Sequence, residues 1–156
     1  MYTFFWHEYD KNGCFSNWYE SKFTVDGLEY FCVEQYMMSQ KALLFGDIAT
    51  NARILGARTP KDCKSLGRQV SPFDSAIWDK KKYEIIKTGL RAKFSQNEEL
   101  RKALLDTGDS ILAEASPFDG IWGIKLDASQ AEKIPPSEWP GENLLGKALM
   151  EIREEL

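Results

Sequence analysis

The chain changes from a strand pattern to a helix pattern within one stretch, Tyr30-Phe31-Cys32-Val33-Glu34-Gln35-Tyr36-Met37-Met38-Ser39-Gln40-Lys41-Ala42. On a helix at about 100° per residue, two turns bring Lys41 to within roughly 20° of Glu34, so both side chains project from one face. The bulky residues around them favour a low dielectric, which shifts the pKa of a buried carboxyl or amine. The stretch therefore predicts a helix that presents a proton donor and an amine together. The alternative is a helix whose Glu and Lys point to solvent or pair with other residues.

Composition limits the class of protein. A chain of 156 residues fits a single domain, residues 1–156, that can bury a core without disulfides. The 20 Lys and Arg residues against 24 Asp and Glu give a net charge of −4, so no global positive field holds a long polyanion. A nucleic acid would have to be bound locally.

The cysteines and the hydropathy pattern indicate a compartment. The three cysteines are odd in number, widely spaced and without a CxxC pair, as expected in a reducing compartment. The start of the chain lacks the basic leader of a secretory signal, and no apolar run approaches membrane-spanning length. We expect a soluble, cytoplasmic protein with no membrane partner.

The segments on either side of the opening stretch predict a mainly α, compact, multihelical single domain with a few short strands. Asp26-Gly27 between apolar runs predicts a two-residue hairpin turn, and residues 2–6 and 22–32 are expected to form short strands. Capping and proline signals predict helices from residue 33 to about 46, after Asp47, after Thr59-Pro60, over 76–95, over 98–105 and over 144–156. Residues 111–115 and 121–124 are expected to be strands around a turn. In the long helix, the predicted buried side is Ile77, Trp78, Ile85, Ile86, Leu90 and Phe94, with Lys80-Lys81-Lys82 on a solvated face.

Missing motifs exclude several chemistries. His7 is the only histidine, so a Ser-His-Asp or Cys-His mechanism and a zinc site of several histidines are not expected. The chain has neither a GxGxxG fingerprint nor a P-loop. We therefore expect no metal and no cofactor. Acid/base chemistry from carboxylates, or imine formation by a desolvated lysine attacking a sugar carbonyl, remains.

Several short segments combine polar groups with aromatic rings. In Asp119-Gly120-Ile121-Trp122-Gly123 an acid and an indole stand beside glycines that let a planar base approach the backbone; an ordinary turn with a core tryptophan is the alternative. Phe15-Ser16-Asn17-Trp18 has a composition suited to a nucleotide or a sugar, or to a packed loop. Arg68 after Gly67 is a candidate phosphate ligand, and Asn143 is a helix cap or a polar contact to a ligand.

Taken in order, these segments resemble the NADAR family of YbiA-like N-glycosidases, nearly from end to end. The resemblance rests on Phe15-Ser16-Asn17-Trp18, Glu34-Gln35-Tyr36, Gln40-Lys41, Gly67-Arg68, Arg91-Ala92-Lys93-Phe94, Glu114-Ala115-Ser116-Pro117, Asp119, Trp122-Gly123, Asn143-Leu144-Leu145-Gly146 and Leu149-Met150-Glu151-Ile152-Arg153.

The resemblance implies cleavage of an N-glycosidic bond between a ribose carbon and a nitrogen base. It implies Glu34 as the catalytic carboxylate and Lys41 as the imine former, with substrate contacts from Phe15, Ser16, Asn17, Trp18, Arg68, Asp119, Trp122, Gly123 and Asn143. Relatives are associated with ADP-ribosyl-guanine in nucleic acid, or with phosphorylated ribosylamino-pyrimidine intermediates of riboflavin synthesis. The Glu114-Ala115-Ser116-Pro117 lead-in favours the first substrate, ADP-ribosyl-guanine.

One departure affects substrate choice rather than reaction type. Many relatives carry a glycine-rich segment after Trp-Gly, whereas this chain has Ile124-Lys125-Leu126-Asp127. Lys125 then either narrows the site or contacts a phosphate. A module that binds ADP-ribose or NAD without turning it over is a further alternative.

Overall fold

The computed structural model describes all residues from Met1 to Leu156. The chain is mainly α, with seven α-helices and 51% of its residues helical, which confirms the predicted fold class. Its residues separate into two compact units. One comprises Glu20–Asn97, and the other comprises Met1–Tyr19 together with Glu98–Leu156. We call them the helical unit and the split unit.

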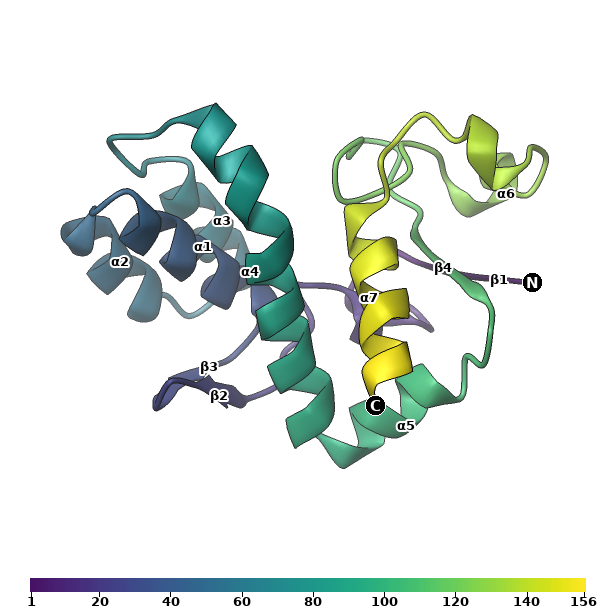
Figure 1. Cartoon of the computed structure of the whole chain (residues 1–156), viewed down its shortest axis with the longest axis horizontal. Coiled ribbons are helices and arrows are strands. Elements are labelled where there is room, and N and C mark those ends of the chain that lie inside the picture. Colours follow the sequence, from purple (N-terminus) through teal and green to yellow (C-terminus); the bar gives the residue numbers. More distant parts are fainter. The chain divides into compact units, whose positions relative to one another are not determined.

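The helical unit contains a hairpin and four helices (Figure 1). The hairpin is formed by β2 (Phe23–Val25) and β3 (Leu28–Tyr30), which pair antiparallel. Asp26 and Gly27 have φ angles of 51° and 82°, as the turn between two right-twisted strands requires. The helices are α1 (Val33–Leu44), α2 (Ile48–Leu55), α3 (Pro60–Gly67) and α4 (Ser75–Gln96). The hairpin and all four helices lie where the sequence predicts them.

Helix α1 is the centre of the helical unit, since α2, α3 and α4 all pack against it. Two glycines allow close approach. A Cβ on Gly67 of α3 would lie 1.9 Å from the sulfur of Met38, and a Cβ on Gly89 of α4 would lie 2.8 Å from a ring carbon of Tyr36. The rings of Phe23, Tyr30 and Tyr36 pack together at centroid distances of 5.0–6.2 Å. These contacts explain why α1 is buried along most of its length.

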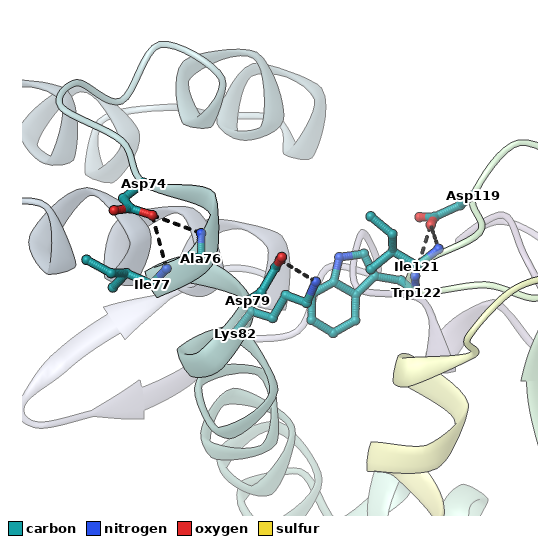
Figure 2. A network of polar contacts seen from close by, with 8 residues as sticks. All are labelled: Asp74, Ala76, Ile77, Asp79, Lys82, Asp119, Ile121 and Trp122. Carbon is teal, nitrogen blue, oxygen red and sulfur yellow. Dashed lines mark hydrogen bonds and ion pairs between the residues drawn. The ribbon is translucent and has the colours of Figure 1, made fainter.

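The buried side of α4 is shorter than the sequence predicts. Ile86, Leu90 and Phe94 are fully buried, but Ile77 is 44% exposed because it lies in the first turn, before the part of the helix that packs. Lys82 departs from the predicted solvated face. It is buried and forms an ion pair of 2.8 Å with Asp79 one turn earlier (Figure 2).

The split unit has a parallel pair of strands, β1 (Tyr2–Phe5) and β4 (Ile111–Glu114), with Tyr2 opposite Ile111. A parallel pair needs a long crossover, and here the crossover includes the whole helical unit. Helix α7 (Leu144–Glu155) packs on β4 and contacts α5 (Glu98–Leu105). The remaining elements are η1 (Gly13–Phe15), α6 (Ala128–Ala131) and η2 (Pro136–Glu138).

Residues 121–124 do not form the predicted strand. Their backbone is used elsewhere: the carbonyls of Ile121, Trp122 and Gly123 accept hydrogen bonds from the N–H groups of Leu144, Leu145 and Asn143 at 3.0–3.2 Å. The segment therefore supplies the acceptors for the first N–H groups of α7, which have no partner within the helix. Only Ile124 bonds back to β4, through its N–H to the carbonyl of Glu114 at 2.9 Å.

Candidate active site

Glu34 and Lys41 both lie on α1, two turns apart. Glu34 is 6% exposed, and its Oε2 atom is among the buried side-chain oxygens. Lys41 is half-buried near the end of the helix. The two charges interact, since the Glu34 carboxylate acts to raise the pKa of Lys41. The structure thus places the two predicted catalytic groups on one helix and within electrostatic reach of each other.

The Lys41 amine lies beside two aromatic rings. Its Nζ is 4.8 Å from the centroid of the Phe73 ring and 5.7 Å from that of the Trp78 ring. The pKa of Lys41 falls below its ordinary value of 10.5, chiefly because burial disfavours the charged form; Glu34 opposes this shift and the positive charge of Arg68 adds to it. A lysine with a lowered pKa carries more of the neutral, nucleophilic amine at physiological pH.

The third residue of this group, Arg68, is brought near by helix packing. It follows Gly67, whose missing side chain lets α3 lie directly against Met38 of α1. Arg68 itself is exposed, and its charge acts on Lys41. Of the predicted site residues, Glu34, Lys41 and Arg68 are therefore the three that the helical unit brings together.

Buried polar side chains fix the orientation of α1, a role that sequence analysis missed. Gln35, next to Glu34, accepts a hydrogen bond from Phe31 N at 2.9 Å and donates to the carbonyl of Ile54 at 3.1 Å. One turn further, the hydroxyl of Ser39 donates to Asn51 at 2.5 Å. A buried amide with its partners satisfied resists rotation of the helix. These bonds hold the face that carries Glu34.

Phe73 and Trp78 were also missed as site residues. Phe73 lies in a loop that the sequence pattern does not place, and Trp78 was assigned only to the buried side of α4. Asp47, the cap of α2, accepts hydrogen bonds from Thr50 N and also from Ser71 N at 2.9 Å, which ties the loop to α2. Asp74 caps α4 through the N–H groups of Ala76 and Ile77, as Figure 2 shows. Between these two anchors the Phe73 ring packs edge-on against Phe45 at 5.2 Å.

Neighbouring groups on α1 are poor alternatives as nucleophile or acid. The thiol of Cys32 is buried, caps α1 by accepting from Gln35 N, and has its pKa raised by a hydrogen bond with Cys63 and by burial. Burial likewise raises the pKa of Tyr36 to about 12. Cys32 therefore stays a thiol and Tyr36 a phenol at neutral pH. Lys41 is the group in this region whose pKa moves toward neutrality.

The predicted substrate residues of the first loop lie in the split unit. Phe15, Ser16 and Asn17 are buried, and Trp18 is partly exposed. The Ser16 hydroxyl accepts from Trp18 N at 3.2 Å, and the Phe15 ring packs against Phe5 at 5.9 Å. Asn17 is 7% exposed, and its Oδ1 atom has no hydrogen-bond partner. A buried acceptor without a donor is costly, so this oxygen is suited to a ligand hydroxyl or amide.

The residues around Trp122 are largely engaged in local structure. The Oδ1 atom of Asp119 accepts from the N–H groups of Ile121 and Trp122, both at 2.9 Å (Figure 2). Gly123 is required by packing, because a Cβ there would lie 2.8 Å from the carbonyl oxygen of Glu114. Lys125 has a φ of 62° and is exposed, with its side chain beside Gly120.

Asn143 occupies the cap position of α7, but its side chain does not cap the helix. Its Nδ2 donates to the carbonyl of Leu112 at 3.0 Å, and its Oδ1 accepts from Glu114 N at 3.2 Å. The amide thus fastens the start of α7 to two residues of β4. A φ of 53° explains why asparagine, which tolerates the left-handed region, stands here.

The structure contains no group of three or more His, Cys, Asp or Glu side chains placed to hold a metal ion. None of its helices combines the length and hydropathy that a membrane span needs.

The chain is similar to several known proteins. A family model described as the NADAR domain matches residues 4–156. N-glycosidase R617 of Acanthamoeba polyphaga mimivirus is 49% identical over 99% of this chain and 95% of its own length. N-glycosidase YbiA of Escherichia coli is 33% identical over 97% of this chain and 86% of its own. The solved structure of YbiA superimposes with a TM-score of 0.80 over 98% of this chain and 83% of that chain, at 32% identity.

This chain covers less than half of one further relative. Riboflavin biosynthesis protein VVA0006 of Vibrio vulnificus is 32% identical over 97% of this chain, which covers 38% of that protein.

These matches show that the chain is an N-glycosyl hydrolase, an enzyme that cleaves the bond between a sugar carbon and a nitrogen. The chain belongs to the NADAR family.

Proposed function

We propose that the protein releases ADP-ribose from a nitrogen base through acid/base catalysis by Glu34 and covalent catalysis by Lys41. One observation carries the proposal: a lysine whose pKa is lowered by burial lies two turns from a buried carboxylate on the same helix. The names of the relatives support the bond type, and the site supports the roles.

The first step opens the sugar. Glu34 gives a proton to the ring oxygen, or to the departing nitrogen, as the bond from that atom to the anomeric carbon breaks. In the ring-opening route the base nitrogen stays on the anomeric carbon as an iminium, and the neutral Lys41 amine adds to that carbon. Transfer of one proton from the lysine nitrogen to the base nitrogen lets the base leave, and an imine of Lys41 with the sugar remains.

The second step restores the enzyme. Water adds to the imine carbon, with the Glu34 carboxylate taking its proton, and the amine leaves to give the sugar aldehyde. The sum is one water consumed, one base and one sugar released, and both side chains returned to their starting protonation. Arg68, whose charge already acts on Lys41, would bind the phosphate of the sugar.

The split unit carries the other proposed contacts. Asn17, with its buried and unpartnered Oδ1, is the residue there whose polar group is most suited to a ligand donor. We propose that Phe15, Ser16 and Trp18 shape the surroundings of Asn17. Trp122, Asp119, Gly123 and Asn143 are proposed as substrate contacts on family resemblance, and Asp119, Gly123 and Asn143 also have the local roles described above.

For the substrate we propose guanine carrying ADP-ribose in a nucleic acid. Support comes from the resemblance of Glu114-Ala115-Ser116-Pro117 to that branch of the family. The name of the Vibrio relative favours a second candidate, a phosphorylated ribosylamino-pyrimidine.

Incubation with an oligonucleotide that contains ADP-ribosyl-guanine, and separately with the pyrimidine ribosylamine phosphate, tests both proposals. We expect the released sugar, identified by mass spectrometry, from the first substrate at the higher kcat/KM. A preference for the second substrate would assign the riboflavin-related reaction. Binding of ADP-ribose with no product from either would indicate a binding module, and the Glu34→Gln protein controls for contaminating activity.

A further inference from the structure

The aromatic rings beside Lys41 have no part in the chemistry above, yet the structure holds them firmly. Phe73 is 47% exposed, although its ring contacts both the Lys41 amine and the ring of Phe45. An exposed aromatic ring on an anchored loop presents an accessible apolar surface in a fixed orientation. Such a surface is suited to stacking on a planar group.

The chemistry proposed for Lys41 defines what lies near that ring. When the amine attacks, its nitrogen lies about 3–3.5 Å from the anomeric carbon. The base nitrogen is bonded to the same carbon, so the edge of the base lies within roughly 5 Å of Nζ at that moment. The centroid of the Phe73 ring is 4.8 Å from Nζ. Both groups therefore lie within about 5 Å of the same nitrogen, and a base on the Phe73 side of the amine can reach the ring.

The anchors of the loop fit this role. Before Phe73 in the chain, Asp47 accepts a hydrogen bond from Ser71 N, and after it Asp74 caps α4. Hydrogen bonds on both sides of Phe73 therefore fix its position, in addition to the contacts of its ring. The ring of Trp78, 5.7 Å from the same amine and only partly exposed, closes a second side of it. The amine thus lies among aromatic groups and away from full hydration.

We propose that Phe73 stacks on the nitrogen base of the substrate and thereby selects for ribosyl groups attached to a planar base over free sugars. The inference rests on the proposed function, since it takes Lys41 as the group that attacks the anomeric carbon. It adds a specificity residue that the sequence motifs did not indicate.

The test separates contact with the base from effects on the amine. Phe73→Leu keeps an apolar side chain beside Lys41 but removes the flat ring, and Phe73→Tyr keeps the ring. Leu43→Ala is the matched control: Leu43 is 42% exposed on the same helix as Lys41 and is turned about 200° away from it. Thermal unfolding of each variant confirms that it is folded.

Two reactions are measured on each variant. The first is kcat/KM for whichever ribosylated base the intact protein turns over. The second is borohydride trapping of ribose 5-phosphate, a sugar with no base. We expect Phe73→Leu to lose about tenfold in kcat/KM, as for removal of one base-stacking ring. Trapping of ribose 5-phosphate and its pH profile should stay within about twofold of the intact protein, and Phe73→Tyr and Leu43→Ala should keep both activities.

The opposing outcomes are distinct. If Phe73→Leu keeps its kcat/KM, or loses turnover and trapping equally, the stacking role is wrong while the proposed function stands. If the intact protein turns over a ribosylated base but traps no sugar, Lys41 is not the attacking group, and the imine and the stacking inference that rests on it are both wrong while the bond cleavage stands. If the intact protein turns over no ribosylated base, the proposed function fails and this inference fails with it.

Discussion

The surroundings of Lys41 in the helical unit and the residues around Trp122 in the split unit differ in how their functional groups are used. Beside Lys41 the nearest neighbours are aromatic rings and two charges, and the amine is partly desolvated. Around Trp122 the carboxylate of Asp119 and the amide of Asn143 are engaged with backbone groups. Both regions contain family motifs. The first leaves a reactive group available, whereas the second uses its motif residues to hold a turn and a helix.

A motif can therefore recur in a family for two physical reasons. Gly67 and Gln35 belong to segments that resemble the family, and here they fix the packing of α1 against α3 and α2. Glu34 and Lys41 stand in the same segments with their charges near each other. Substitutions in the two regions should therefore affect turnover at Glu34 and Lys41, and stability at Gly67 and Asn143.

Replacement of Glu34 by Gln should have the largest effect. The change keeps the shape of the side chain but removes the proton donor, so we expect turnover to fall by about 10²–10⁴. Steady-state kinetics on the substrate identified above measures it. Glu29→Gln, at an exposed hairpin carboxylate, is the control and should keep its rate. A Glu34→Gln protein with normal turnover would remove Glu34 from the mechanism.

Replacement of Gly67 by Ala should disturb the helical unit without touching a reacting group. A Cβ there would lie 1.9 Å from the Met38 sulfur, so we expect a loss toward the upper end of the roughly 1–3 kcal/mol typical of overpacking. Urea unfolding measures the loss. Gly56→Ala is matched to it, since a Cβ at Gly56 meets its nearest atom at 3.6 Å, an ordinary contact. Equal stability of the two variants would contradict the packing role of Gly67.

Replacement of Asn143 by Gly tests the structural side of the comparison in the split unit. Glycine keeps the left-handed backbone but loses both bonds to β4, so we expect a loss of about 2 kcal/mol. Asn143→Ala should lose more, because alanine is also strained at a φ of 53°. Chemical unfolding of both variants checks the order. A raised KM with unchanged stability would instead favour the substrate contact.

The smallest effect is expected from Asp47. Hydrogen bonds from Ser71 N and then from Thr50 hold the pKa of this carboxyl below its ordinary value of 3.8. Because the folded pKa is the lower one, the stabilisation is complete above the unfolded pKa and is lost as pH falls through the folded pKa. Asp47→Asn should therefore lose less stability than the intact protein as pH falls through and below 3.8, the ordinary pKa of the carboxyl. Parallel acid-unfolding curves would contradict the assignment.

Much of the fold could be predicted from local signals. The Asp26-Gly27 turn, the Asp47 cap and the Thr59-Pro60 helix start all depend on residues within a few positions of each other, and the structure has each of them. The strand predicted for residues 121–124 was wrong. Their apolar pattern is that of a strand, but their carbonyls accept hydrogen bonds from the start of α7, some twenty residues further on.

The same limit applies to the candidate site. The spacing of Glu34 and Lys41 follows from helix geometry and could be predicted. The contacts of Lys41 with Phe73 and Trp78 could not, since Phe73 lies in a loop that Asp47 anchors and Trp78 lies near the start of α4. Both contacts depend on how these segments pack beside α1. Lys82 is a similar case, because its burial depends on packing that a run of three lysines does not indicate.

The proposed mechanism depends most on an imine between the Lys41 amine and the sugar. Borohydride reduction during turnover, followed by peptide mapping, tests it directly on the intact protein and on Lys41→Arg, which keeps a positive charge without a nucleophilic amine. We predict a mass increase equal to the reduced sugar on the peptide that contains Lys41, and none in the variant. Active turnover with no adduct on Lys41, or a variant that keeps its rate, would show that the reaction does not pass through an imine of Lys41.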